Sequence, residues 1–234
     1  LLILGEDGTG KERAARALHQ LSPRRNGAFV YVDCAAMPAL ALIADLSGYK
    51  RGAVPGQAAA RRGLLREAAG GTLYLDRLDR VAPEAQVFLA RLLETGTFRA
   101  LGSERDSPVE ARLIFAATPD LPARAETGAF LPGLSFALLR NVWRLPALRD
   151  RPEDIPTIAE AVLQGLGADA PTLSTGALAV LRVLDYPANL RQLEALVERA
   201  ATLLPDGDRV LMAAQIEAAR GVHAAMPEPE AEGL

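Results

Sequence analysis

Apolar and polar positions along the first two thirds of the chain predict strands and helices in turn. Short apolar runs, which predict buried strands, lie within residues 1–4, 28–32, 70–77, 112–118 and 142–145. Between them, apolar positions recur at helical spacing in residues 13–21, 39–46 and 83–93. Residues 97–108 predict a hairpin-like insertion. This alternation predicts an α/β fold with a parallel sheet.

The pattern changes after Pro146. Residues 149–156 form a charged linker marked by prolines, and the chain beyond it is helical. The segments with helical periodicity are residues 155–166, 175–184, 189–204 and 211–220. We therefore expect an α/β core over residues 1–148 and a small all-helical subdomain over residues 149–221. Residues 222–234, rich in Ala, Glu and Pro, are expected to form a disordered tail.

Composition narrows the class of protein. Half of the 234 residues are hydrophobic, which is enough to bury a full core. No apolar run approaches the width of a bilayer, and the single Cys34 fits a reducing compartment, so we expect a cytoplasmic protein without membrane contact. A net charge of −3 and an aromatic share of 5% do not favour nucleic-acid binding. The only histidines, His19 and His223, are expected at the surface rather than in catalysis.

The chain begins inside a strand, as a fragment of a longer protein would. The strand is followed by a glycine-rich turn with the spacing G-x-x-x-x-G-K, and a helix follows the turn. Backbone N–H groups and the helix dipole in such a turn favour a bound phosphate, and the lysine reaches the outer phosphates. The candidate phosphate-binding residues are Gly5, Glu6, Asp7, Gly8, Thr9, Gly10, Lys11 and Glu12. A glycine turn that carries a lysine by chance is the alternative, and the flanking strand and helix argue against it.

Two further stretches have candidate chemistry. The strand within residues 70–77 ends at Asp76, and a strand-end aspartate helps to hold Mg²⁺ in P-loop nucleotidases. Residues 47–57 form a loop punctuated by Gly and Pro, with the adjacent cations Lys50 and Arg51. From composition alone, this loop can be either functional or a solvated surface loop.

Several motifs occur in a fixed order: G-E-x-G-T-G-K-E, G-G-T-L-x-L-D, R-L-I-x-A-A, L-R-x-R-x-E-D-I-P and x-P-x-N-x-R-x-L. This order resembles the central AAA+ domain of bacterial enhancer-binding proteins, the NtrC-type activators of sigma-54 RNA polymerase. The similarity extends from Leu1 to about Arg220. It implies a Rossmann-like core with a helical lid, and self-association into a dimer or ring. It also implies ATP or ADP with Mg²⁺ as ligands, an RNA polymerase sigma factor or holoenzyme as partner, and DNA contact only through a domain outside this chain.

Residues that the family uses for hydrolysis are substituted here. Arg77 stands where the family has its catalytic glutamate, and Asp33 where it has the asparagine coupled to that glutamate. A cation cannot accept a proton from the attacking water as a carboxylate does. Thr118 falls at the sensor I asparagine, a milder change because a hydroxyl still forms hydrogen bonds.

The arginines that reach a neighbour's nucleotide in the family are also missing. Leu131 and Ala137 occupy their positions. Because an arginine finger contributes roughly 10³ to 10⁵ in rate, we expect hydrolysis near background. By contrast, Arg191 matches the sensor II arginine of the lid. The resemblance therefore adds Asp76, through Mg²⁺, and Arg191 to the nucleotide-binding residues and assigns no catalytic residue.

The loop aligns with the family's sigma-contact signature Gly-Ala-Phe-Thr-Gly-Ala. The aligned residues are Gly52, Ala53, Val54, Pro55 and Gly56. Valine offers less contact area than phenylalanine, and proline lacks a donor, so normal remodelling of sigma-54 through this loop is not expected.

Three functions stay open at this point. The first is a transcription-regulatory domain that binds ATP or ADP with little or no hydrolysis. The second is an active, ring-forming ATPase that remodels the sigma-54 holoenzyme. The third is a non-catalytic interaction scaffold, in which Arg77 fills the metal or phosphate space.

Overall fold

The computed structural model describes residues 1–167, 169–205 and 207–224. Its internal contacts divide the chain into two compact units. The first contains Leu1–Glu6 and Gly10–Leu145, and the second contains Asp7–Thr9 and the chain from Pro146 onward. The tip of the glycine-rich loop is thus part of the second unit.

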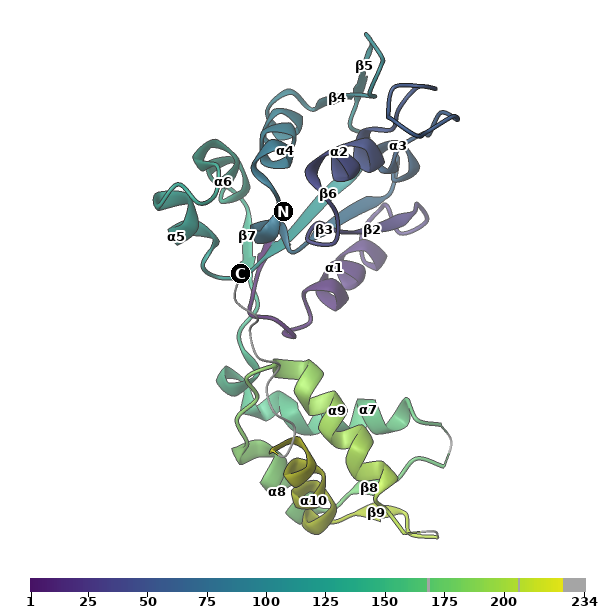
Figure 1. Ribbon diagram of the computed structural model, residues 1–234. Helices are drawn as coiled ribbons and strands as arrows, with labels where there is room; N and C mark the ends of the chain where they lie inside the picture. The colour runs from purple at the N-terminus through teal and green to yellow at the C-terminus, as the bar shows by residue number, and fades with distance from the viewer. Residues whose placement is uncertain (168, 206, 225–234) are drawn as a thin grey trace. The chain divides into compact units, whose positions relative to one another are not determined.

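A sheet of five parallel strands forms the centre of the first unit (Figure 1). The strands are β1 (Leu2–Leu4), β2 (Phe29–Asp33), β3 (Thr72–Asp76), β6 (Arg112–Ala117) and β7 (Val142–Arg144). Their order across the sheet is β2-β3-β6-β1-β7, which confirms the predicted parallel α/β fold. In this register Asp33 lies opposite Asp76, so both carboxylates occur at the carboxyl edge of the sheet.

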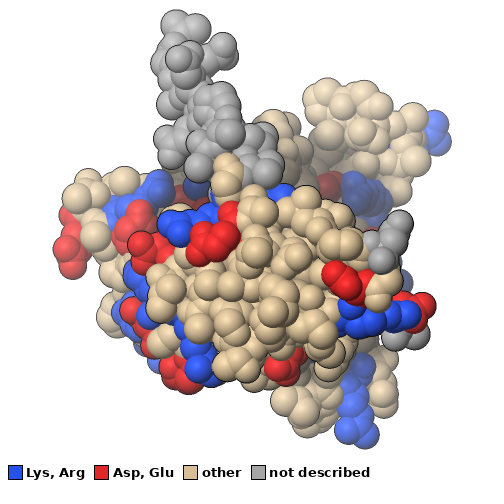
Figure 2. Space-filling model, turned by 90° about the horizontal axis from the view of Figure 1, so that it is seen from below, with Lys and Arg blue, Asp and Glu red and all other residues tan. Residues whose placement is uncertain are grey.

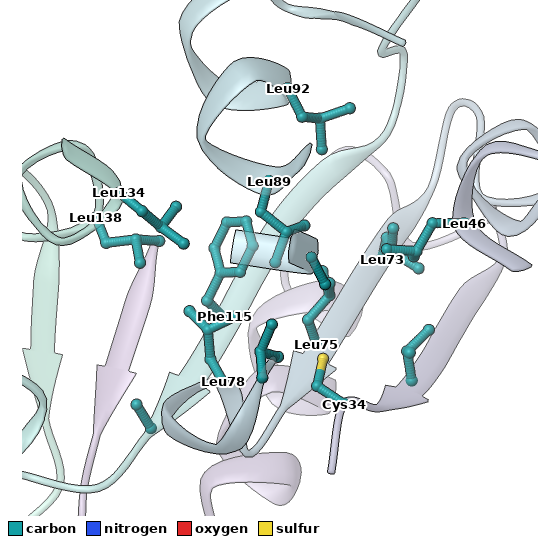
Figure 3. Packing of buried hydrophobic residues seen from close by; sticks show 14 of the residues in the cluster. Cys34, Leu46, Leu73, Leu75, Leu78, Leu89, Leu92, Phe115, Leu134 and Leu138 are labelled. Atoms are coloured by element: carbon teal, nitrogen blue, oxygen red, sulfur yellow. The ribbon is translucent and has the colours of Figure 1, made fainter. Parts of the chain in front are cut away.

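Helices cover both faces of this sheet. They are α1 (Lys11–Gln20), α2 (Ala39–Ser47), α3 (Leu64–Glu67), α4 (Pro83–Thr95), α5 (Leu121–Glu126) and α6 (Pro132–Leu138), with the 3₁₀ turn η1 (Leu78–Arg80). Ala15 of α1 packs with Tyr74 and Ile114 on one face. Leucines of α2, α4 and α6 pack with Leu75 and Phe115 on the other (Figure 3). Because successive strand residues point to opposite faces, both faces of these strands are apolar.

The insertion after α4 is the predicted hairpin. Its strands, β4 (Thr97–Arg99) and β5 (Asp106–Pro108), pair antiparallel. The sequence did not predict α3, α5 and α6. None is longer than seven residues, and α3 and α5 each bury a single leucine, which is too little to give a helical periodicity.

The expectation that His19 is a surface residue is wrong. His19 is 6% exposed, and its Nδ1 lies 3.0 Å from the hydroxyl of Thr72. Its ring meets Phe29 edge to face with centroids 5.5 Å apart. His19 lies in the last turn of α1, and its side chain faces the sheet at β2 and β3. The side chain of His223 lies outside the part that the structure describes.

The second unit is mostly helical. Its elements are η2 (Leu148–Asp150), η3 (Pro152–Asp154), α7 (Ile155–Gln164), β8 (Thr172–Leu173), α8 (Thr175–Val183), α9 (Asn189–Thr202), β9 (Val210–Leu211) and α10 (Ala213–Ala224). Leu181, Leu193 and Ile216 lie at the centre of its core. This unit agrees with the expected helical subdomain, to which the structure adds one pair of two-residue strands, β8 and β9, in which Thr172 N–H donates to the carbonyl of Arg209 at 2.9 Å.

The last helix extends further than expected. The sequence places the start of a disordered tail at Val222, whereas α10 continues through Ala224. The rest of that predicted tail, residues 225–234, lies outside the described residues.

Charge is evenly mixed on the face seen in Figure 2. Basic and acidic side chains lie next to one another around an uncharged central area. Charges of one sign therefore do not form a single large patch on this face. Among the described residues, every helix is too short or too polar to cross a bilayer.

Candidate nucleotide-binding site

The glycine-rich loop connects β1 to α1 in the manner of a phosphate-binding loop. Gly8 and Gly10 have positive φ angles of 78° and 95°, a conformation that glycine adopts without strain. Gly10 is also the N-cap residue of α1, so the helix begins without a capping side chain. Lys11 is largely buried, and its Nζ donates to the carbonyls of Gly5 at 2.8 Å and Glu6 at 3.0 Å. The loop therefore places a cation and the amino end of a helix together.

Gly8, at the loop tip, is in close contact with other residues of the second unit. A Cβ atom at this position would lie 2.1 Å from the carbonyl oxygen of Ala188, so no larger residue fits. It would also lie 3.5 Å from Cβ of Arg191. The structure thus brings the predicted sensor II arginine beside the loop tip, with its side chain exposed.

Asp76, the proposed magnesium residue, lies in a polar cluster at the end of β3. Its Oδ1 accepts from the backbone N–H of Arg77 at 2.9 Å and from the hydroxyl of Tyr74 at 3.1 Å. Oδ2 lies 3.5 Å from the Tyr31 hydroxyl. Burial, and then the charge of Asp76, raise the pKa of Tyr74, so this hydroxyl stays protonated as a donor. Burial also raises the pKa of Tyr31, with a smaller contribution from Asp76.

The two substituted positions of the water-activating pair contact each other. Arg77 Nε donates to Asp33 Oδ1 at 2.8 Å, and Nη2 pairs with Oδ2. The Asp33 carboxylate also accepts from the N–H of Ala35 at 3.0 Å. Arg77 has a positive φ of 51°, a left-handed conformation that is uncommon for a non-glycine residue. A guanidinium donates only, so the position of the family's catalytic glutamate has no proton acceptor, and the Asp33 carboxylate is engaged by Arg77 and Ala35.

Thr118 forms hydrogen bonds with two nearby aspartates. Its N–H donates to Oδ1 of Asp79 at 3.2 Å, and its hydroxyl donates to Asp120. Asp79 is a buried carboxylate that sequence reasoning missed. The signal for it is its position three residues after Asp76, in the 3₁₀ turn that follows β3.

Neither substituted arginine position has a charge. Leu131 packs against the hydrophobic core, and its N–H donates to Gln86 at 2.7 Å. Ala137 lies in α6 between Phe136, which is 70% exposed, and the core residue Leu138. The guanidinium of Arg140, which follows α6 in the chain, lies 5.6 Å from the centre of the Phe136 ring.

The loop that aligns with the sigma-contact signature has an open conformation. Gly52 and Gly56 have φ angles of 76° and 78°, and no atom lies within 4 Å of a Cβ built on either. Its base is fixed where Tyr49 pairs with Arg61. Pro55 is exposed and Val54 is half-buried, so the tip presents little apolar area.

Cys34 and Glu12 contribute no reactive group. Burial raises the pKa of the Cys34 thiol to about 12, so the side chain is a neutral part of the core. Glu12 accepts from Arg16 Nε at 2.8 Å along the surface of α1. Among the described residues, the structure contains no group of three metal-binding side chains.

Comparisons with known proteins identify the family of this chain. The family model of the Sigma-54 interaction domain matches residues 1–142, and that of the AAA+ ATPase lid domain matches residues 149–228. The chain belongs to the Sigma-54 interaction domain family. The Nif-specific regulatory protein of Azotobacter vinelandii is 38% identical over 210 residues, which cover 88% of this chain and 40% of that protein. The DNA-binding transcriptional activator HyfR of Escherichia coli is 42% identical over 207 residues, covering 87% of this chain and 31% of HyfR.

Solved structures show the same fold. The structure of NtrX from Brucella abortus is similar with a TM-score of 0.80 and 33% identity, over 91% of this chain and 49% of NtrX. NtrX structures with ADP and with ATP have TM-scores of 0.77 and 0.79. The predicted resemblance, with an AAA+ α/β core followed by a lid, is therefore confirmed. The chain spans between 30% and 47% of the length of the curated relatives compared.

Proposed function

We propose that this domain binds ATP or ADP as a regulatory ligand, with little or no hydrolysis, in a sigma-54-type transcription regulator. The observation that carries the proposal is the contrast between two parts of one site. In the first unit Lys11 donates to the carbonyl of Gly5, and within the second unit Arg191 lies next to Gly8, as expected for residues that bind phosphate. The residue at the catalytic glutamate position, Arg77, is instead bound to Asp33.

Each part of the site has a definite role in this proposal. The loop amides and Lys11 would hold the phosphates, and Arg191 would add charge from the lid. Asp76 would hold Mg²⁺, whose charge neutralises phosphate oxygens. Because the residue directly after Asp76 is Arg77 and not a carboxylate, and neither Leu131 nor Ala137 is charged, bound nucleotide would persist. Nucleotide would then act by stabilising one state of the domain.

The NtrX structures with ADP and ATP support this ligand class. Membership of the family supports an RNA polymerase sigma factor or holoenzyme as partner, with contact weakened at Val54 and Pro55, as well as self-association into a dimer or ring. DNA contact would come from another part of the protein, and the site of action would be the cytoplasm.

The proposal is tested with purified protein by calorimetric titration of ADP and ATP and by phosphate release. We expect measurable affinity for both nucleotides, no phosphate release above that of Lys11→Ala, and loss of affinity in Lys11→Ala. Robust turnover would contradict the proposal.

An active, ring-forming ATPase is the second candidate. Its support is the 37–42% identity to proteins described as activators and regulators. Stimulation of sigma-54-dependent transcription in vitro by this chain would favour it. The scaffold hypothesis has less support, because the Arg77 guanidinium is bound to Asp33 instead of being free for the phosphate space. Absence of a thermal shift with ATP and Mg²⁺ would favour the scaffold.

A further inference from the structure

We infer that Asn189 and Arg151 are positioning residues of the nucleotide site, which hold the tip of the phosphate loop in its anion-binding orientation. The inference rests on the proposed nucleotide binding. It adds two residues that bind the loop through its carbonyl groups and leave its amides to the ligand. Both belong to the second unit, as does the loop tip Asp7–Thr9.

Three successive carbonyls of the loop each accept a hydrogen bond from this unit. Asn189 Nδ2 donates to the carbonyl of Asp7 at 2.9 Å. The N–H of Leu190 donates to the carbonyl of Gly8 at 2.9 Å. Arg151 Nη2 donates to the carbonyl of Thr9 at 3.1 Å. The peptide groups from Asp7 to Gly10 are thus fixed one after another.

The direction of these bonds determines where the loop amides point. In a trans peptide the C=O of one residue and the N–H of the next point in opposite directions. The carbonyls of residues 7–9 point toward their donors, Asn189, Leu190 and Arg151. The N–H groups of residues 8–10 therefore point away from these donors. Gly8 and Gly10 give the loop wide conformational freedom, so without these bonds the peptide groups can rotate. The clamp formed by Asn189, Leu190 and Arg151 therefore pre-orients three amides for one anion.

Asn189 is suited to this role by its own conformation. It has a φ of 52° and is fully buried, and asparagine tolerates this left-handed region better than most residues. While its Nδ2 donates to the loop, its Oδ1 accepts from the N–H of Leu148 at 2.7 Å. One side chain therefore ties the loop tip to the turn η2.

The position of Arg151 beside the loop leaves one of its buried donors without a hydrogen bond within the described part of the chain. Its Nε is buried and has no hydrogen-bond partner among the described residues, an arrangement that destabilises a buried donor. Its Nη1 lies 3.8 Å from Asp154, which keeps the guanidinium charge next to Thr9. The bond to the Thr9 carbonyl is the contact that this placement makes possible.

The test measures ADP affinity by calorimetry and the melting temperature without nucleotide. Asn189→Asp keeps the acceptor for Leu148 and the tolerance for positive φ, but it replaces the donor to Asp7 with an oxygen. Arg151→Met removes the donor to Thr9 at similar size, and Arg151→Lys restores a donor. We expect about tenfold weaker ADP binding for Asn189→Asp and for Arg151→Met, with at least partial recovery in Arg151→Lys. The control Arg209→Met, at a surface pair with Asp169, should bind ADP as the wild type does.

Two results would overturn the inference while the wild-type protein binds ADP. One is unchanged ADP affinity in Asn189→Asp and Arg151→Met, with or without a lower melting temperature, which would give these residues a purely structural role. The other is an Arg151→Lys variant that binds no better than Arg151→Met. If Asn189→Asp fails to fold, the comparison of Arg151→Met with Arg151→Lys still tests the inference. Absence of ADP binding by the wild-type protein would overturn the proposed function together with this inference.

Discussion

Arg77 binds Asp33 across the carboxyl ends of two neighbouring strands, with Nε donating to Oδ1 at 2.8 Å. The two positions that depart from the family's water-activating pair are therefore joined to each other. The substitutions replace an amide and a carboxylate with a carboxylate and a guanidinium, so an interaction between the positions is kept while the chemistry changes. This relationship gives the first two predictions.

Reversing the charge at Arg77 should destabilise the domain. Arg77→Glu places a second carboxylate beside Asp33, and we expect a melting temperature about 2–4 °C lower, the range for a partly exposed pair in a chain of this size. Adding Asp33→Asn removes the repulsion and should restore most of the loss. Arg25→Glu is the control, because Arg25 is an exposed arginine at a surface turn. An Arg77→Glu variant as stable as the wild type would contradict the importance of the pair.

Restoring the pair alone should not restore turnover. In Asp33→Asn/Arg77→Glu, we expect phosphate release to stay within a few-fold of the Lys11→Ala background, because no arginine stands at Leu131 or Ala137 and a finger contributes roughly 10³ or more in rate. Release is measured with a coupled phosphate assay at saturating ATP and Mg²⁺. High turnover in this double variant would show that another cation, such as Arg140, takes the place of the missing arginines.

Gly8 should be intolerant of any side chain. We expect Gly8→Ala to lower ADP affinity more than tenfold, because its Cβ would lie 2.1 Å from a backbone oxygen and would push the loop away from Ala188. Gly56→Ala is the control for backbone strain, since Gly56 has the same φ of 78° with open space around it. Both variants should lose a few degrees of melting temperature from the left-handed conformation, and only Gly8→Ala should lose affinity. Equal affinities would argue against the close approach.

Alkaline pH should destabilise the protein partly through Cys34. The pKa of the thiol is about 8.5 in an unfolded chain, and burial raises it to about 12 in the folded protein. Above about pH 8.5 the unfolded chain loses the proton that the folded protein keeps, so stability falls as pH rises, by up to about 1.4 kcal/mol per pH unit. Denaturant unfolding between about pH 8.5 and 10 should show a shallower decline for Cys34→Ala. Identical slopes would contradict the buried, neutral thiol.

The sequence predicts features that depend on local spacing. The glycine-rich turn between a strand and a helix, the other strands and the helix α9 are found near where the pattern places them, because each depends on residues close together in the chain. Arg191 was identified by motif, and it does lie beside Gly8. The position of Asp76 at a strand end was likewise readable from seven consecutive residues.

Long-range contacts were not predictable in the same way. The pairing of Arg77 with Asp33 follows from the register of β2 and β3, which sequence alone does not fix. The bond from Asn189 to Asp7 joins residues 182 positions apart, and only folding makes it visible. His19 was expected at the surface rather than in catalysis, yet the fold buries it beside Thr72, a partner 53 positions along the chain.

The first turn of α1 has one more consequence. Because Gly10 stands at its N-cap, the helix lacks the side-chain oxygen that serine, threonine or aspartate would offer to amides of its first turn. A phosphate at this position would serve as the missing cap, an interaction of about 1 kcal/mol when a side chain provides it. The ligand would thereby complete a secondary-structure element, and the beginning of α1 should fray in its absence. Amide hydrogen exchange at the start of this helix would then report occupancy directly, whether or not the nucleotide is ever cleaved.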